Sequence, residues 1–584
     1  MQQPDGDNTK NMVIAMVLTL AVLVGWSVFF DAPKAPQEPQ QAEQTVDGSK
    51  PTLPATNRPA LGDAPALPNG AGIVPPKTVK EVIESTARLQ IDTPSLSGSI
   101  RLKGGRLDDL TFKKYNEKVD KTGKNITLLS PDQTEQPYFA DFGWLSSASS
   151  IIKVPDADTL WQAEGNAVLT VDRPVRLTWE NGQGLTFERV ISVDEDYLFT
   201  VKDQVRNASA QDVSLYAYAM ITRDEVKEVS SFFILFEGPI GYLGDKLIEH
   251  KYDDLNEGQK THNVTGGWAG FTDKYWLTAL IPPQDMASKV TYRHVMNASK
   301  HRYFTDYISP AFALKAGQSI NFTNHFYAGA KVLALLDSYE EKLGIKHFDL
   351  AVDFGWFYFL TKPIFHVLTY TKDYLGNFGL AILLLTVVLK LLFFPLANKS
   401  YRSMARMKQL QPKMAKLKEL HKDDKMAMNQ ALMNLYKKEK VNPMAGCLPM
   451  IIQIPVFFAL YKVLFVSIEM RQAPFYGWIK DLSAPDPTSL FNLFGLLPYD
   501  VPSFLQIGAW PLIMGATMFM QQRLNPAPTD PMQEKMFMLM PLIFTVMLAS
   551  FPAGLVIYWA WNNTLTIAQQ WTIMRMEAKR TGSK

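Results

Sequence analysis

Long apolar runs alternate with polar stretches and divide the chain into six candidate membrane spans and one large polar domain. An α-helix rises about 1.5 Å per residue, so about 20 apolar residues cross the hydrocarbon core of a bilayer. Residues 1–30 contain the first run, and residues 376–397 form the second. The first run ends in bulky residues and a proline, which do not suit a cleavage site, so we expect an uncleaved transmembrane anchor.

Residues 447–571 contain four more apolar segments, which predict transmembrane helices three to six. These segments are residues 447–467, 506–523, 536–551 and 554–571. A loop with several prolines separates the third span from the fourth, and a tight turn joins the last two. The carboxy-terminal half is therefore expected to be a polytopic helical membrane protein.

Two polar segments precede the second span. Residues 31–78 are rich in Pro, Ala and Gln and poor in large apolar side chains, so we expect a flexible linker. Residues 79–345 show short runs of alternating apolar and polar positions, separated by Asn, Gly and Asp. One run is Val175–Glu180, which an Asn-Gly turn follows, and another begins at Val213. This pattern predicts an all-β sandwich with a large core.

Residues 351–374 are amphipathic and rich in aromatic side chains, with Pro363 in the middle. They are too polar to span a bilayer comfortably. They fit a helix that lies in the membrane interface, with Trp and Tyr at the level of the headgroups. The alternative is a helix packed beneath the β domain, and both interpretations stay open.

Residues 398–442 are strongly basic, and two helical stretches flank a polar turn within them. We expect a helical hairpin in the cytoplasm, because positive charge marks cytoplasmic loops. The amino terminus and the basic tail at residues 572–584 then also lie in the cytoplasm, and the β domain lies outside. The charged face either only sets the topology or also contacts anionic lipid or ribosomal RNA. The candidate contact residues are Arg402, Arg406, Lys408, Lys413 and Lys416.

Lys390 lies inside the second apolar run, four residues after Thr386 and on the same helix face. A cation there costs about 3 kcal/mol on insertion scales unless it meets water or a partner, which makes Lys390 a functional-site candidate. The alternative is that Lys390 snorkels to the nearer headgroups. Lys462, near the outer end of the third span, is expected to snorkel.

Polar side chains also follow one face of the last span at helical spacing: Tyr558, Asn562, Thr566, Gln569 and Gln570. Gln453 adds an amide in the third span. Polar groups in hydrocarbon need partners or water. They either hydrogen-bond to one another and hold helices together, or line a wet cavity with Lys390. We favour the cavity, because the predicted spans contain no acidic residue that would neutralise the lysine.

Composition narrows the function classes. The net charge of +2 averages unlike regions, and the single cysteine, Cys447, excludes an intramolecular disulfide framework. The sequence contains no HExxH or other metal-ligand spacing, no Gly-rich phosphate loop and no GxSxG elbow. We therefore expect neither a metal nor a cofactor, and the pattern argues against an enzyme and against an ATP-driven machine.

Short motifs along the helical half carry a specific resemblance. In chain order they are Phe394-Pro395-Leu396, Leu410-Gln411-Pro412-Lys413, Val441-Asn442-Pro443, Gly446-Cys447-Leu448-Pro449, Gln453-Ile454-Pro455, Ala459-Leu460-Tyr461, Arg471-Gln472-Ala473-Pro474-Phe475, Trp478-Ile479-Lys480-Asp481-Leu482-Ser483, Thr529-Asp530-Pro531-Met532 and Phe551-Pro552-Ala553-Gly554-Leu555. With these motifs the chain resembles the YidC/Oxa/Alb family of membrane insertases, in its Gram-negative form with a large periplasmic domain.

The resemblance implies five core helices around a hydrophilic groove that is open to lipid and cytoplasm, and a β-supersandwich domain in the periplasm. In the family the positive charge of the groove is usually an arginine, and Lys390 stands at the matching position. Lysine keeps the charge but loses the planar, bidentate fork of arginine. The expected groove residues are Lys390, Thr386, Gln453, Tyr558, Trp559, Asn562 and Thr566.

The resemblance also implies a function: an ATP-independent insertase and chaperone for new inner-membrane proteins, working alone or with the Sec translocon. The expected partners are nascent membrane proteins, the translocon, the ribosome and anionic lipids, with no small-molecule substrate. Two other classes stay open. A secondary transporter would use Lys390, although no second copy of the lysine-bearing span is present. A membrane-anchored sugar-binding or sugar-modifying protein would need a carboxylate or histidine pair in the β domain.

Overall fold

The computed structural model describes residues 76–147, 152–165, 168–224, 235–297, 300–421, 424–439, 441, 448–499, 501–502, 505–525 and 531–582. The chain divides into two units, Met1–Arg58 and Pro59–Lys584, and every described residue belongs to the second. The expected anchor at residues 1–30, nearly all of the expected linker at 31–78, and Cys447 lie outside the described residues.

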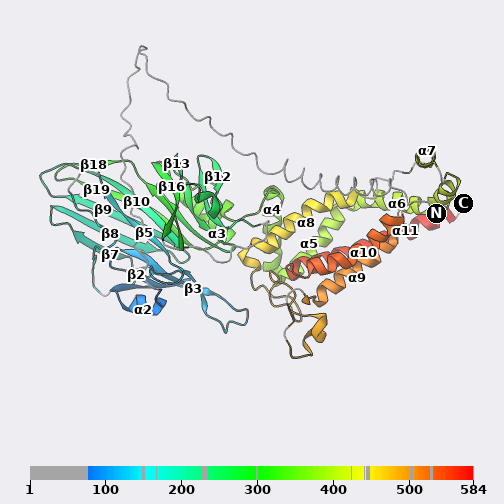
Figure 1. Ribbon diagram of the computed structural model, residues 1–584, viewed down its shortest axis with the longest axis horizontal. Coiled ribbons are helices and arrows are strands. Elements are labelled where there is room, and N and C mark those ends of the chain that lie inside the picture. Colours follow the sequence, from blue (N-terminus) through cyan, green and yellow to red (C-terminus); the bar gives the residue numbers. More distant parts are fainter. Residues whose placement is uncertain are drawn as a thin grey trace, which may run out of the picture. The chain divides into compact units, whose positions relative to one another are not determined.

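The β domain consists of two antiparallel sheets (Figure 1). The first sheet runs in the order β1 (Arg88–Asp92), β2 (Leu96–Arg101), β3 (Arg106–Asn116), β5 (Tyr138–Ser146), β10 (Val213–Asp224), β17 (Lys300–Ile308), β16 (Ala287–Asn297) and β13 (Lys260–Thr265), with β4 (Asn125–Leu129) on β3 and β18 (Phe312–Leu314) on β10. The second runs in the order β12 (Lys246–Glu249), β11 (Gly238–Leu243), β14 (Trp268–Thr272), β15 (Trp276–Ile281), β19 (Ser319–Ala330), β9 (Leu198–Asn207), β8 (Leu185–Val193), β7 (Val175–Glu180) and β6 (Gln162–Ala163). Two short helices, α2 (Val79–Glu84) and η2 (Tyr252–Leu255), accompany them.

The two sheets pack face to face through aromatic side chains. Phe142 of β5 meets Phe326 of β19 edge to face, with ring centroids 5.8 Å apart, and Trp144 meets Phe322 at 6.0 Å. Along β8 every second residue is buried, as expected for a strand with one face on the core. The sandwich expected from the alternating runs is therefore the observed fold.

The predicted Asn-Gly turn after Val175–Glu180 joins β7 to β8. The Asn181 side-chain oxygen accepts hydrogen bonds from the backbone N–H of Gln183 and of Leu185, at 2.8 and 2.9 Å. Gly182 has φ of 70°, in the left-handed region that glycine adopts without a steric cost. The local sequence thus sets the register of this hairpin.

Three elements lead from the sandwich to the helical half: α3 (Leu333–Leu343), η3 (Phe348–Ala351) and α4 (Tyr358–Leu375). The expected helix at residues 351–374 was predicted to begin too early. Gly355 has φ of 67°, outside the helical region, so α4 begins only at Tyr358. Its inner face packs against α5 and α8, and its other face leaves Phe359, Tyr370 and Tyr374 exposed.

The expected straight span at residues 376–397 is instead two helices, α5 (Phe378–Leu392) and α6 (Phe394–Leu420), which meet at a bend of 69°. Pro395 causes the break, because it has no N–H to donate to the carbonyl of Leu391, whereas it fits the first turn of a new helix. The boundary expected at residue 398 therefore lies inside α6. After the turn, α7 (Lys425–Lys438) packs back on α6 through Leu410, Met414 and Leu432.

The remaining helices are α8 (Leu448–Val466), η5 (Ile468–Met470), η6 (Leu490–Gly495), α9 (Ala509–Leu524), α10 (Pro531–Leu548) and α11 (Ala553–Gly582). The segment expected as a separate tail at 572–584 continues α11 to Gly582, because neither Gly nor Pro interrupts residues 555–581. α11 packs against α9, α5 and α6. Among the described helices, none by itself combines the length and apolar composition needed to cross a bilayer, and only α5 and α6 together do so.

The segment after α8 holds the β domain against the helical half. Arg471 and Gln472 donate from Nη2 and Nε2 to the backbone carbonyl of Asn116, at 2.7 and 3.0 Å. Further along, the Tyr275 hydroxyl donates to Ser483 Oγ at 3.3 Å. Lys462, expected to snorkel, instead forms an ion pair with Asp353 (Nζ to Oδ2, 2.9 Å), because the carboxylate before α4 lies within its reach.

Candidate functional site

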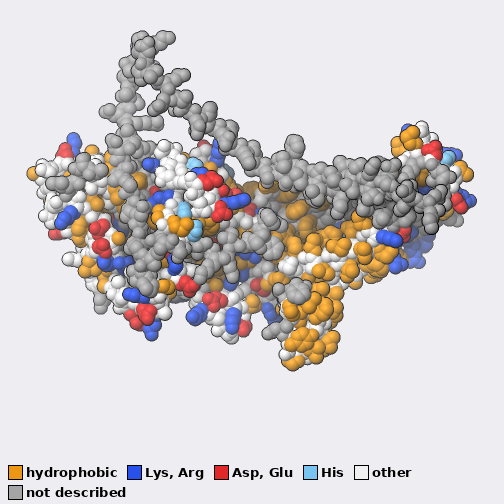
Figure 2. Space-filling view, viewed as in Figure 1, with side chains coloured by type: hydrophobic (Ala, Val, Ile, Leu, Met, Phe, Trp, Pro, Cys, Tyr) orange, Lys and Arg blue, Asp and Glu red, His pale blue; other side chains and the backbone are white. Residues whose placement is uncertain are grey.

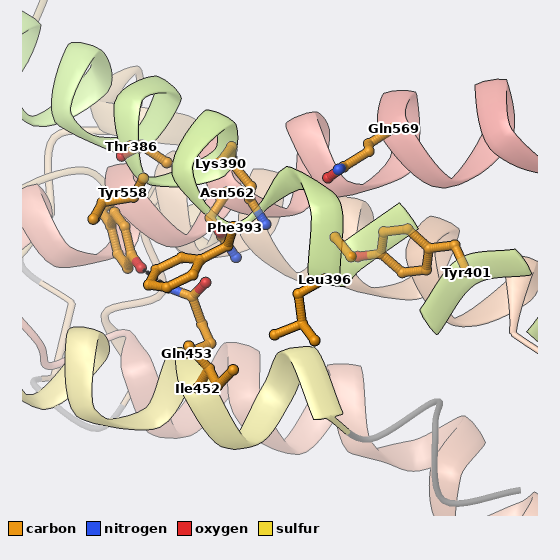
Figure 3. A pocket seen from close by; sticks show the side chains of 12 residues that line it. Thr386, Lys390, Phe393, Leu396, Tyr401, Ile452, Gln453, Tyr558, Asn562 and Gln569 are labelled. Atoms are coloured by element: carbon orange, nitrogen blue, oxygen red, sulfur yellow. Dashed lines mark hydrogen bonds between the residues drawn. The ribbon is translucent and has the colours of Figure 1, made fainter. Parts of the chain in front are cut away.

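A pocket lies among α5, the start of α6, α8 and α11 (Figure 3). Its lining is Thr386, Leu389, Lys390, Phe393, Leu396, Ala397, Tyr401, Ile452, Gln453, Tyr558, Asn562 and Gln569. The space free for water inside it is about 30 Å³, enough for one or two molecules. Polar side chains thus face a small cavity whose other walls are apolar.

Lys390 stands in the last turn of α5 and points into this pocket (Figure 3). Its Nζ donates to Thr566 Oγ1 of α11 at 2.8 Å. Within the part of the chain that the structure describes, no carboxylate lies within ion-pair distance of this ammonium. The carbonyl-rich end of α5 favours a cation, and this partial charge gives the lysine weak electrostatic support. The pocket therefore contains an ammonium group that pairs with no carboxylate among the described residues.

Only some of the other polar groups of the pocket have hydrogen-bond partners. Gln453 Nε2 donates to the Tyr558 hydroxyl, which joins α8 to α11. In contrast, Asn562 Oδ1 and Gln569 Nε2 are buried and have no hydrogen-bond partner among the described residues. An unmet buried polar atom costs about 1–3 kcal/mol, so these two atoms favour water in the pocket. Within the polar stripe, Tyr558 thus links two helices, while Asn562 and Gln569 face the cavity. Gln570 lies away from it and donates from Nε2 to Asn525 Oδ1 at 3.1 Å.

Two expected groove residues differ from the rest. The Thr386 hydroxyl lines the pocket but donates to the carbonyl of Ile382 in its own helix, at 2.7 Å. Trp559 is not part of the lining, because it lies on another face of α11. There it packs against Phe457 of α8 and Phe544 of α10, at centroid distances of 4.8 and 5.8 Å. The structure therefore brings together Lys390, Thr386, Gln453, Tyr558, Asn562 and Thr566, but not Trp559.

The sequence reasoning missed Tyr401, Phe393 and Leu396, which close the pocket from the α6 side. Tyr401 follows Lys390 by eleven residues, or about three helical turns, so its spacing is a usable signal. That signal is weakened because α5 ends at Leu392 and the chain then bends.

The basic residues of α6 differ in what they contact. Arg406 pairs with Glu577 of α11 (Nη2 to Oε1, 3.3 Å), and Lys413 pairs with Glu439 after α7 (Nζ to Oε1, 2.7 Å). Lys408 and Lys416 are exposed, and Arg402 is half-buried. The exposed lysines are available for an external anion, whereas Arg406 also fastens α6 to α11.

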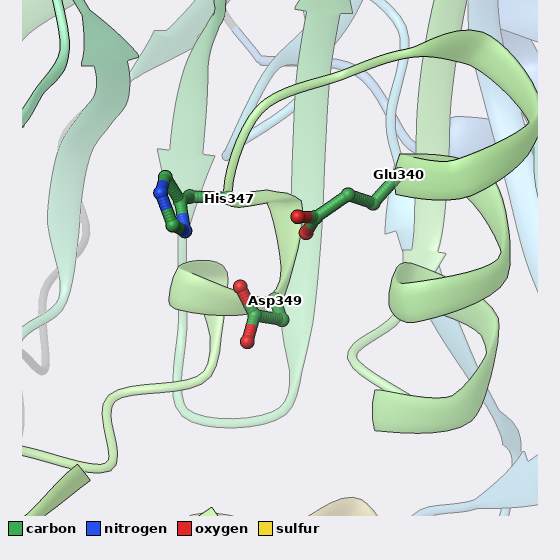
Figure 4. A group of neighbouring side chains, drawn as sticks. All are labelled: Glu340, His347 and Asp349. Atoms are coloured by element: carbon green, nitrogen blue, oxygen red, sulfur yellow. The ribbon is translucent and has the colours of Figure 1, made fainter. Parts of the chain in front are cut away.

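A second group of polar side chains, Glu340, His347 and Asp349, lies between α3 and η3 (Figure 4). Their ligand atoms lie within 4.8 Å of one another. However, Asp349 accepts hydrogen bonds from Lys362 Nζ at 2.6 Å and from the Tyr358 hydroxyl, and Glu340 accepts from the backbone N–H of Phe348. The Lys362 ammonium also stabilises Asp349 as a counter-charge, so this group fixes the connection from α3 to α4.

Two ionisable groups, the partly buried Glu469 and the buried Lys331, lie near the contact between the β domain and the helical half. Glu469 Oε1 accepts from the backbone N–H of Leu333 at 3.3 Å, while its buried Oε2 has no partner among the described residues. Burial raises the pKa of Glu469 to about 7. Burial also lowers the pKa of Lys331, which donates to Thr272 Oγ1 at 3.0 Å, to about 8. This contact therefore contains groups that titrate near neutral pH.

The sequence comparisons with known proteins agree on one family. The family model for the YidC periplasmic domain matches residues 88–367, and the model for the 60Kd inner membrane protein matches residues 370–580. The chain is 48% identical to the membrane protein insertase YidC of Methylorubrum extorquens (strain PA1), over 98% of this chain and 96% of that protein. It is 50% identical to the membrane protein insertase YidC of Brucella suis biovar 1 (strain 1330), with the same coverage. An active YidC insertase crystal structure overlaps with a TM-score of 0.34 and 17% identity, over 82% of this chain and 91% of that chain.

The β-rich domain and the helical core with its polar pocket thus define an inner-membrane protein with a large periplasmic domain. The chain belongs to the YidC family of membrane protein insertases. It is an insertase and not an enzyme, and its substrates are nascent membrane proteins. The family assignment is confirmed, and so is the fold class as a β-rich periplasmic domain joined to a helical membrane core.

Proposed function

We propose that the pocket around Lys390 receives the polar end of a nascent membrane segment and attracts its acidic residues. The observation that carries this proposal is the Lys390 ammonium, which donates to the neutral hydroxyl of Thr566 at 2.8 Å and has no carboxylate partner among the described residues. A cation in apolar surroundings without a counter-charge is costly, and a passing carboxylate would lower that cost. Transient occupancy by substrate is therefore favourable without a covalent step.

The pocket walls fit a short-lived polar guest. Asn562 Oδ1 and Gln569 Nε2 offer one acceptor and one donor that no described residue uses. The apolar walls, such as Phe393 and Ile452, give a guest no further polar anchor. Apolar parts of the substrate then pass into lipid, and their burial supplies the driving force, so ATP is not required.

A lysine at position 390 decides how the pocket recognises a carboxylate of the substrate. An ammonium is a compact point charge with three donors, whereas a guanidinium binds a carboxylate with two parallel hydrogen bonds. Lys390 therefore attracts acidic segments without demanding one geometry. This property suits a site that releases many different substrates.

The remaining features of the proposal concern topology and partners. The chain crosses the membrane six times, so both termini lie in the cytoplasm. The anchor at residues 1–30 is the first span, and the bent pair α5 and α6 begins the core. The helix α4 lies in the membrane interface. The exposed lysines of α6, Lys408 and Lys416, meet ribosomal RNA or anionic lipid. The insertase works alone or beside the Sec translocon.

Charge reversal at Lys390 tests the proposal. In vesicles, Lys390→Glu should lower insertion of a substrate with an acidic translocated segment about tenfold, equal to about 1.4 kcal/mol, because a carboxylate repels that segment. A neutral-segment substrate should insert nearly as before. Protease protection of the translocated segment measures both.

Two variants control this experiment. Lys390→Arg keeps the charge and should keep the insertion of both substrates. Lys399→Glu makes the same reversal at an exposed position on α6 outside the pocket and should have little effect. Equal loss for acidic and neutral substrates, or unchanged insertion by Lys390→Glu, would refute the electrostatic role.

A further inference from the structure

An exposed apolar loop precedes α9 and plays no part in the pocket. Residues 487–499 contain no Lys, Arg, Asp or Glu. Within them, every large apolar side chain is at least 40% exposed: Leu490, Phe491, Leu493, Phe494, Leu496, Leu497 and Tyr499. Leu496 reaches 81%. We call residues 487–499 the apolar loop. A contiguous patch of exposed apolar side chains of this size marks an interaction surface.

The backbone of the apolar loop satisfies many of its hydrogen bonds internally. The N–H of Phe494 donates to the carbonyl of Ser489 at 2.7 Å, and the N–H of Leu497 donates to the carbonyl of Asn492 at 3.1 Å. The Asn492 side chain accepts from the N–H of Gly495 at 3.0 Å, and the Tyr499 hydroxyl donates to the Phe491 carbonyl. Non-helical backbone enters an apolar medium only when its polar groups have partners, and these contacts meet much of that need.

The base of the loop is fixed to the start of α9. The buried Asp486 carboxylate accepts from the backbone N–H of Trp510 at 2.9 Å and from Trp478 Nε1 at 3.1 Å. Thr488 Oγ1 accepts from the N–H of Ala509 at 3.0 Å. A carboxylate and a hydroxyl thus cap the first turn of α9, which favours negative charge. The exposed loop therefore extends from a rigid base.

The tip of the loop holds an unfavourable backbone conformation. Leu493 and Phe494 have φ of 51° and 59°, in the left-handed region that bulky residues avoid. Such residues persist where the surrounding contacts impose them, and they cluster at functional sites. Here the turn leaves both side chains about half exposed instead of folding them under the loop.

The loop lies on the periplasmic side of the bundle. The same connection between α8 and α9 holds Arg471 and Ser483, which bond to Asn116 and Tyr275 of the periplasmic domain. Figure 2 shows the hydrophobic surface of the helices continuing onto this loop. On α10 that surface includes Leu539, Leu542 and Ile543, each more than half exposed. The apolar loop therefore adjoins the surface that faces lipid.

We propose that the apolar loop inserts its tip into the outer leaflet of the inner membrane, beside α9. Lipid is the occupant because the loop offers no charge and continues the lipid-facing surface of the helices. Its tyrosine, Tyr499, suits the interface between headgroups and acyl chains. The loop then anchors the periplasmic end of α9 in one leaflet, independently of the pocket around Lys390.

Fluorescence from single cysteines in the full-length protein tests this insertion. In a Cys447→Ser background, Leu496→Cys and Leu493→Cys carry an environment-sensitive fluorophore in vesicles of phosphatidylethanolamine and phosphatidylglycerol. The probes should emit at short wavelength, be quenched by lipids with a nitroxide high on the acyl chain, and be protected from iodide. Two sites are used because Leu496, unlike Leu493, has ordinary helical φ.

Matched positions calibrate the result. Leu542→Cys on α10 reports hydrocarbon, and Lys202→Cys on the exposed side of β9 reports water. Loop probes that behave like Lys202→Cys and respond to iodide would overturn the proposal. Short-wavelength emission without quenching by lipid would also overturn it, because a protein surface would then cover the loop. If a second copy of the chain covered the loop, the emission would depend on protein density in the vesicles, and this outcome would overturn the proposal as well.

Discussion

Two buried arginines of the β sandwich and the lysine of the pocket meet different kinds of partner. Inside the sandwich, Arg189 has no exposed side-chain surface and meets Asp203 through two bonds of 2.7 and 2.9 Å. Arg88 meets Asp108 in the same way, at 2.7 and 3.0 Å. In the helical core, the Lys390 ammonium donates to a neutral hydroxyl, that of Thr566, and pairs with no carboxylate among the described residues.

This contrast separates charges that are paired within the fold from a charge that is left for another partner, as proposed for Lys390. A buried pair with two parallel hydrogen bonds gives each charge an opposite charge and ties strands of one sheet together: β8 to β9 for Arg189, and β1 to β3 for Arg88. A cation without a counter-charge contributes little to folding, but it keeps its attraction for an anion that arrives later. We therefore expect removal of a charge to lower stability in the sandwich, and to lower insertion but not stability in the helical core.

The largest effect is expected in the sandwich. Arg189→Leu leaves Asp203 buried without its partner, so we expect the free energy of unfolding of the β domain to fall by about 3–5 kcal/mol. Thermal unfolding of the full-length protein, followed by loss of protease resistance of the β domain, measures this. A midpoint close to that of the wild type would mean that water or another residue replaces the arginine.

A smaller effect is expected from pH at the contact between the two regions. The folded state holds a proton on Glu469 up to about pH 7, whereas an unfolded chain releases it near 4.5. The stabilising contribution is therefore complete below pH 4.5 and is lost as pH rises through 7. We expect about 2 kcal/mol less stability at pH 8 than at pH 5 from this group.

Glu469→Gln should remove that part of the pH dependence, because the amide does not titrate. The comparison uses the difference in unfolding midpoint between wild type and variant across pH 5 to 8. Lys331 also titrates near this contact, and its contribution cancels in the difference. Parallel pH profiles for the two proteins would show that Glu469 is already ionised in the folded state.

A still smaller effect on stability is expected for Lys390→Leu. The variant loses one hydrogen bond to Thr566, typically worth about 0.6 kcal/mol between membrane helices, and is relieved of burying a charge. We expect the thermal midpoint of the helical core to stay close to that of the wild type while insertion of acidic substrates falls. A large loss of stability would place Lys390 with Arg189, among the structural charges.

An effect of similarly small size is expected for Arg176→Leu. Arg176 meets Glu188 across β7 and β8 at 2.7 Å, the same distance as in the Arg189 pair, but its side chain is 47% exposed. Exposed pairs contribute about 0–1 kcal/mol because water screens them. Chemical unfolding of this variant and of Arg189→Leu separates the effect of burial from the effect of the distance between the charges. Equal losses in the free energy of unfolding would show that burial does not decide the strength of these pairs.

Local patterns predicted the elements that depend on local physics. The alternation in Val175–Glu180 and the Asn-Gly turn after it were enough for β7 and its hairpin. The alternation from Val213 predicted a strand with one polar face, and β10 is instead buried on both faces. Its second face packs Tyr218 and Met220 against Phe304 of β17, a contact between distant segments that one strand's pattern does not contain.

The pocket was predictable where side chains follow one helix. Tyr558 and Asn562 share a face because they are four residues apart, and both line the cavity. Trp559 was expected beside them on the strength of the family resemblance alone, and its position one residue on turns it toward Phe544. Tyr401 was missed because the bend at Phe393 changes the direction of the chain.

The hydrogen bonds from Arg471 and Gln472 to Asn116 join segments made at very different times during translation. More than 350 residues separate the two partners. The sandwich is synthesised completely before α8 leaves the ribosome, and domains generally fold as units in that order. Docking of the sandwich on the helical core is therefore a late step of biogenesis, and it completes only after α8 and the segment beyond it have been synthesised.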